Sequence, residues 1–127
     1  MANLTSMNTR KLLIGTGVAL VTNLAVYGIA SASGATWEAG LPFPINLLMV
    51  AAATIVPMLL GWQVVRLLGK RKPALITWAA WLGLAFALAT APSGLIAAMD
   101  ISTGPALSSM HVVVGLAWFF SIKSKKN

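Results

Sequence analysis

The chain contains no cysteine and very few groups that carry chemistry. Of its 127 residues, two are acidic and one is histidine. Without cysteine there is no disulfide, no thiolate nucleophile and no cysteine-bound metal or cluster. With one histidine and two carboxylates, the chain lacks most of the side chains that acid–base or nucleophilic catalysis requires. We therefore expect no enzymatic activity, no metal site and no disulfide-rich secreted fold.

Charge is scarce as well, since only 9% of the residues are charged while 58% are hydrophobic. The mean hydropathy is +0.86. Soluble domains usually carry about 25% charged residues, and a small domain has a large surface to cover. This hydrophobicity also excludes a disordered chain. The composition therefore predicts an integral membrane protein.

Four apolar segments are long enough to cross a bilayer, which takes about 20 helical residues. Gly69 and a basic turn before Pro73 separate two of them, as expected of a helix end followed by a helix start. The first also resembles a signal peptide, but its apolar run of about 19 residues exceeds the usual 7 to 15, so we expect it to be retained. We predict one domain over residues 1–127, an all-α bundle of four transmembrane helices. The predicted spans are residues 12–32, 44–68, 74–91 or slightly beyond, and 105–122.

All basic residues fall on one side of this topology, and both acids, Glu38 and Asp100, fall in the opposite loops. The positive-inside rule then predicts a bacterial cytoplasmic membrane protein with both termini in the cytoplasm. We expect the net charge of +7 to face anionic lipid headgroups rather than nucleic acid. The basic residues lie before the first span, between the second and third, and after the fourth: Arg10, Lys11, Arg66, Lys70, Arg71, Lys72, Lys123, Lys125 and Lys126.

Each predicted span carries one polar residue at a similar depth. At about 1.5 Å per residue, Asn23 lies about 13 Å and His111 about 10 Å from the outer ends of their spans, and Thr54 and Thr90 lie near that level. Unpaired polar groups are costly in hydrocarbon. We therefore expect these four side chains to face the bundle interior as one layer, with Asn23 and His111 approaching one another.

A second polar group is expected nearer the outer surface. Tyr27 lies one turn outward from Asn23, Asn46 is near the start of the second span, and Ser108 shares a helix face with His111. Together with Asp100 they would line a small vestibule open to the outer side. Asp100 itself is a solvated loop residue, an N-cap of the fourth span, or an electrostatic partner of His111.

His111 is the single histidine, the residue type that can exchange a proton near neutral pH. Its structural interpretation is a neutral imidazole hydrogen-bonded to Asn23, Ser108 or a backbone carbonyl. Its functional interpretations are a polar ligand contact, proton-linked transport or haem ligation. Haem would need a second axial ligand from a methionine or another subunit. We expect no haem and no other cofactor.

Several short motifs resemble those of a family of small membrane proteins. They are the run Asn23 to Tyr27, the Leu41–Pro42 loop, Asp100, and the run Met110 to Val113. They are similar to a domain-of-unknown-function family of small four-span membrane proteins found mainly in actinobacteria. The resemblance covers nearly the whole chain and implies a four-helix membrane bundle with an aspartate before the last span and a histidine within it. It implies no activity.

Two functional hypotheses follow. The first is a non-enzymatic membrane component that binds a small or lipidic ligand, or a partner subunit, through these polar residues. The second is a homo-oligomeric, proton-linked transporter or channel that uses His111 and Asp100. Four short helices enclose little room, so the second hypothesis requires at least two copies.

Overall fold

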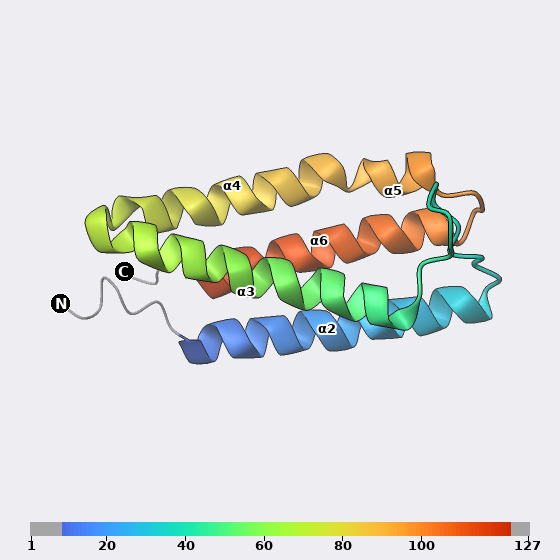
Figure 1. Cartoon of the computed structure of the whole chain (residues 1–127), viewed down its shortest axis with the longest axis horizontal. Helices are drawn as coiled ribbons and strands as arrows, with labels where there is room; N and C mark the ends of the chain where they lie inside the picture. The colour runs from blue at the N-terminus through green and yellow to red at the C-terminus, as the bar shows by residue number, and fades with distance from the viewer. Residues whose placement is uncertain (1–8, 123–127) are drawn as a thin grey trace.

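The computed structural model describes residues 9–122, which form a bundle of antiparallel helices (Figure 1). Only Ala91 separates α4 from α5, so residues 74–97 make one membrane-length segment. The all-helical prediction is confirmed, because every regular element of the described residues is a helix. Four segments of them are long and apolar enough to cross a membrane. The helices are α2 (Thr9–Ala32), α3 (Leu47–Arg71), α4 (Ala74–Thr90), α5 (Pro92–Ala97) and α6 (Thr103–Ile122).

The helix ends differ from the predicted spans by a few residues, for local reasons. The second span begins at Leu47, because the side chain of Asn46 accepts a hydrogen bond of 2.9 Å from the amide of Met49 and so caps the helix. The third continues through Ala97, because Pro92 occupies the first position of α5, where its missing N–H costs little. Asn46 is therefore a structural cap at the N-terminus of α3.

The packing is uneven around α6, which lies against both α2 and α4. Helix α3 packs mainly on α2 and touches α6 least. Figure 1 shows α3 and α4 meeting at the turn that joins them and diverging toward the opposite end of the bundle. Between α3 and the pair α4/α6, the bundle is consequently loose.

Small residues bring the helices together where they pack tightly. Gly15 of α2 lies directly against Ser121 and Ala117 of α6, so its small size serves packing within the bundle. Gly28, nearer the other end of α2, has no neighbouring atom within 4 Å of an added Cβ. Small size is therefore needed at Gly15, whereas Gly28 is free to carry a larger side chain.

The charged residues separate to opposite ends of the bundle. Arg10 and Lys11 lie in the first turn of α2 and Lys70 lies in the last turn of α3, and these helix ends are on the same side of the bundle in Figure 1. Glu38 and Asp100 lie in the loops at the other end. The basic residues of the predicted cluster that follow the fourth span lie outside the described residues: Lys123, Lys125 and Lys126.

Candidate functional site

A cavity of about 660 Å³ lies between α3 and the pair α4/α6. Its volume is within the range of about 300 to 1,000 Å³ that is usual for small-molecule sites. Along α3 it extends from Met49 to Gly61, which is about 18 Å at helical rise. The walls are almost entirely apolar, and α2 contributes Asn23. The site is thus a long, apolar cavity within the membrane-length part of the helices.

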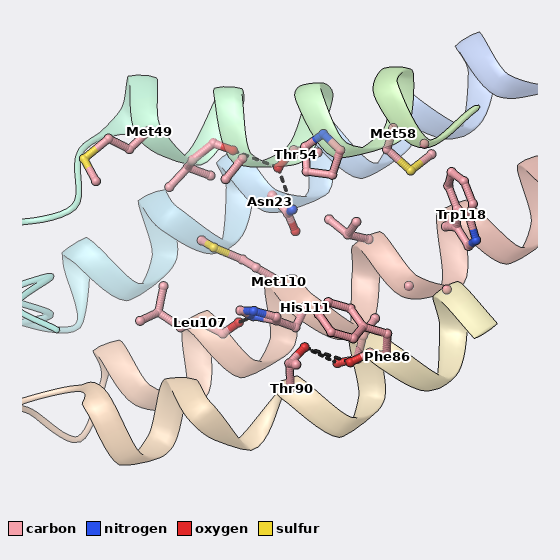
Figure 2. Close-up of a pocket in the computed structure, with 18 of the residues that line it drawn as sticks. Asn23, Met49, Thr54, Met58, Phe86, Thr90, Leu107, Met110, His111 and Trp118 are labelled. Atoms are coloured by element: carbon pink, nitrogen blue, oxygen red, sulfur yellow. Dashed lines mark hydrogen bonds between the residues drawn. The ribbon is translucent and has the colours of Figure 1, made fainter. Parts of the chain in front are cut away.

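The polar layer predicted from the sequence surrounds this cavity. Asn23, Thr54, Thr90 and His111 all line it, each from a different helix (Figure 2). Figure 2 shows Asn23 and Thr54 on one wall and His111 and Thr90 on the facing wall. The structure therefore brings together four residues that the sequence separates by up to 88 positions, from Asn23 to His111.

Asn23 is held by the helix that packs against its own. Its Nδ2 donates a hydrogen bond of 2.9 Å to Oγ1 of Thr54, and that hydroxyl donates its hydrogen to the carbonyl of Val50 at 2.8 Å. The hydroxyl has only one hydrogen, so toward Asn23 it acts as an acceptor. This fixes the amide with Nδ2 on Thr54 and Oδ1 away from it. The Oδ1 atom is buried and has no hydrogen-bond partner.

His111 and Asn23 do not form the pair expected from their depths. Nδ1 of His111 lies 2.9 Å from the carbonyl oxygen of Leu107, one turn earlier in α6. The imidazole is therefore paired with a backbone carbonyl rather than with Asn23 or Ser108. Thr90 likewise bonds within its own helix, donating to the carbonyl of Phe86 at 2.8 Å. The packing of α3 on α2 explains why Asn23 pairs with Thr54 instead.

The outer group does not form the expected vestibule. The ring of Tyr27 stacks on that of Trp37 with centroids 4.5 Å apart. Ser108 donates to the carbonyl of Ala91 at 2.6 Å, and Asn46 caps α3. Tyr27, Asn46 and Ser108 therefore have separate partners.

Trp37 is the residue that sequence reasoning missed. It is only 4% exposed, adopts a positive φ of 62°, and belongs to an apolar cluster with Val50 and Met110. Its Nε1 donates to the hydroxyl of Ser31 at 2.9 Å. An amphipathic ring in a loop of small and polar residues is the signal for it, since such a ring tends to bury its body and pair its N–H. The indole therefore packs against Tyr27, one of the residues predicted to line the vestibule.

Asp100 links the loop that carries Thr36 to the start of α6 by hydrogen bonds. Its Oδ2 accepts hydrogen bonds from the amide and hydroxyl of Thr36 and from the hydroxyl of Thr103, while Oδ1 accepts from the amides of Ser102 and Thr103. These bonds, first that of the Thr36 hydroxyl and then those of Thr103, hold the pKa of Asp100 well below its ordinary value. Asp100 is thus an N-terminal cap of α6, and it does not line the cavity with His111.

The fold and the apolar surface define a small, multi-pass membrane protein. A family model described as a family of unknown function, DUF6069, matches residues 4–126. The chain belongs to this family. No curated protein and no solved structure is significantly similar to it.

Proposed function

We propose that the protein is a non-enzymatic membrane component that binds a lipidic ligand in the cavity between α3 and the pair α4/α6. The observation that carries the proposal is the cavity itself, which is long and apolar and holds its few polar groups at one level. Binding sites for apolar ligands are typically lined by apolar side chains with a few polar groups that orient the ligand. Such a ligand needs no cofactor and no catalytic residue.

The route to this cavity supports a ligand drawn from the bilayer. The cavity is partly open, and residues at its rim, such as Ala53 and Phe86, are exposed on the surface of the isolated bundle. Phe86 is 71% exposed. Because these residues lie within membrane-length helices, the opening faces hydrocarbon rather than water. An apolar molecule could then enter sideways without crossing an aqueous phase.

The proton-linked transporter has less support. It uses His111 with Asp100 as a titrating pair, but Asp100 is occupied by Thr36 and Thr103 in the outer loops. Among the described residues that line the cavity, none is a carboxylate. Ligand binding requires no such partner and is therefore our preferred function.

For the orientation we propose that both chain termini face the cytoplasm of a bacterial cell. The separation of basic and acidic residues to opposite ends supports this, since the basic end is normally retained inside. The chain has no cysteine, so single-cysteine variants give unambiguous labelling. In intact spheroplasts, an impermeant maleimide should label Glu38→Cys, and should label Lys70→Cys only after the membrane is opened. The reverse pattern would invert the orientation.

Photo-crosslinking tests the cavity. The protein is placed in lipid nanodiscs with a long-chain alcohol that carries a diazirine, and the modified peptides are mapped. We expect adducts on the cavity walls of α3, α4 and α6. Ala53→Trp, which places a large ring at the cavity wall, should reduce them strongly.

Ala52→Trp is the matched control, since Ala52 is its exposed neighbour on α3 and does not line the cavity. It should leave the adducts unchanged. Labelling spread evenly over the lipid-facing surface, and equally unaffected by both tryptophans, would contradict ligand binding in the cavity.

A further inference from the structure

The polar groups around the cavity are rich in acceptors and poor in donors. Thr54 and Thr90 each have their hydroxyl hydrogen committed to a backbone carbonyl of their own helix. The indole N–H of Trp118 is also committed to a backbone carbonyl, that of Ala79 at 3.0 Å. Each of these side chains is therefore unable to donate to a ligand while its present bond persists.

His111 adds a further acceptor. Its Nδ1 faces the carbonyl oxygen of Leu107, which can only accept, so the hydrogen resides on Nδ1. In the neutral imidazole this leaves Nε2 as an acceptor. The carbonyl of Ala53 adds to the set, because Pro57 has no N–H to give it the usual helical partner, and both residues line the cavity.

The decisive group is the orphaned oxygen of Asn23. The residue is 1% exposed, yet its Oδ1 has no hydrogen-bond partner. Figure 2 shows the side chain extending from α2 toward the cavity, with Thr54 on its nitrogen side. A buried acceptor left unpaired is costly, and it recovers that cost only when a donor reaches it. Of the amide, only the second hydrogen of Nδ2 remains as a donor.

From these contacts we infer that the ligand is an apolar molecule with a hydroxyl group, whose O–H donates to Oδ1 of Asn23. This inference rests on the proposed cavity function and names the ligand's chemical class. Thr54 is the positioning residue, because its bond to Nδ2 turns Oδ1 toward the ligand. A molecule that can only accept, such as an ether or a quinone, satisfies fewer of the cavity's polar groups.

Access to Oδ1 requires movement of lining side chains, because the atom is covered in the structure. Met58 and Met110 are both buried and both line the cavity. Methionine has three rotatable bonds and repacks at little cost. These two side chains can therefore yield to a hydroxylated chain without movement of the backbone.

Competition between matched ligands tests the inference on the wild-type protein. The diazirine-bearing alcohol is displaced in nanodiscs by octadecanol, by its methyl ether or by octadecane, each compared at the same mole fraction in the bilayer. We expect the ether and the alkane to be about tenfold weaker competitors than the alcohol. Asn23→Leu should make all three competitors equal, while Thr16→Val, a polar-to-apolar change on the same helix away from the cavity, should keep the preference.

The outcomes separate the two levels of the proposal. Three equal competitors on the wild-type protein would overturn the hydroxyl inference and leave cavity binding intact. A preference for the alcohol that survives Asn23→Leu would overturn the assignment to Asn23. Absence of cavity labelling would overturn the proposed function itself. Should Asn23→Leu fail to fold, the wild-type competition and Thr54→Val, which frees the amide to rotate and should weaken the preference, decide the matter.

Discussion

The amide nitrogen of Asn23 on α2 and the hydroxyl of Thr54 on α3 are joined by a buried hydrogen bond of 2.9 Å. Both residues are 1% exposed. Loss of this bond would affect the two residues unequally. Thr54 loses little when Asn23 is removed, since its own hydrogen remains on Val50, whereas Asn23 without Thr54 has its nitrogen and its oxygen both buried and unpaired.

We expect this asymmetry in the free energy of unfolding. Thr54→Val should destabilise the bundle by about 1 kcal/mol, the scale of interhelical hydrogen bonds in membranes. Asn23→Leu should cost less, because it also removes the unpaired Oδ1. Reversible unfolding in mixed micelles gives both values. Thr90→Val, whose hydroxyl bonds only its own helix, is the control and should change stability by a few tenths of a kcal/mol. Equal losses for Thr54→Val and Asn23→Leu would contradict the asymmetry.

His111 should contribute little to stability. Its one described hydrogen bond is to Leu107 of its own helix, so His111→Gln or His111→Leu removes no bond between helices. We expect a change below about 1 kcal/mol in the same unfolding measurement. The ligand's single hydroxyl hydrogen is assigned to Asn23, so His111→Leu should leave the preference for the long-chain alcohol over its ether unchanged. A loss of several kcal/mol on His111→Gln would instead show that the imidazole holds the bundle together.

The spans and the polar layer can be predicted because both follow from the length and composition of helices. A run of apolar residues must cross, and its few polar residues must turn inward, so depth alone identifies Asn23, Thr54, Thr90 and His111. Depth does not determine which neighbour each residue meets. That depends on α3 packing against α2, which the near-uniform apolar surface of the helices leaves open.

Loops are harder to predict than spans. The turn of Trp37 into the bundle requires a positive φ and a stacking partner, Tyr27, and neither shows in a hydropathy pattern. The position of Asp100 just before a helix is compatible with a cap, but its bond to Thr36 joins residues 64 positions apart. Contacts of that range follow from the packed structure rather than from local sequence.

A small substitution beside Trp118 should have a large effect on the free energy of unfolding. Its indole lies between Gly61 of α3 and Gly83 of α4, where an added Cβ at Gly61 would come within 2.7 Å of the ring. Gly83→Ala should displace the ring, break its bond to Ala79 and cost about 1 to 3 kcal/mol, as overpacking usually does.

Gly28→Ala is the matched control, since nothing lies near that position and alanine favours a helix. It should leave the unfolding free energy unchanged or raise it slightly. Similar effects of Gly83→Ala and Gly28→Ala would show that the indole is not held between the two glycines.

The stability of the loops that Asp100 joins should depend on pH through this carboxyl. The pKa of this carboxyl is held below its ordinary value of 3.8, chiefly by the hydroxyl of Thr36. A lowered pKa in the folded state means that the contribution to stability is complete well above 3.8 and declines as the pH falls toward the folded pKa. Acid should therefore loosen the loop that carries Thr36 and Trp37 before it affects the helices.

Amide hydrogen exchange tests this behaviour at Thr36 and Trp37, whose N–H groups donate to Asp100 and to Thr103. Relative to the unfolded chain at each pH, we expect their protection to fall as the solution is acidified from about pH 6 to about pH 3. Asp100→Asn should lower protection already at neutral pH and remove its pH dependence, because an amide nitrogen cannot accept these bonds. Glu38→Gln, the change at the exposed acid in the same loop, should keep the wild-type profile. A pH dependence that persists in Asp100→Asn and disappears in Glu38→Gln would assign the effect to Glu38 and overturn the role given to Asp100.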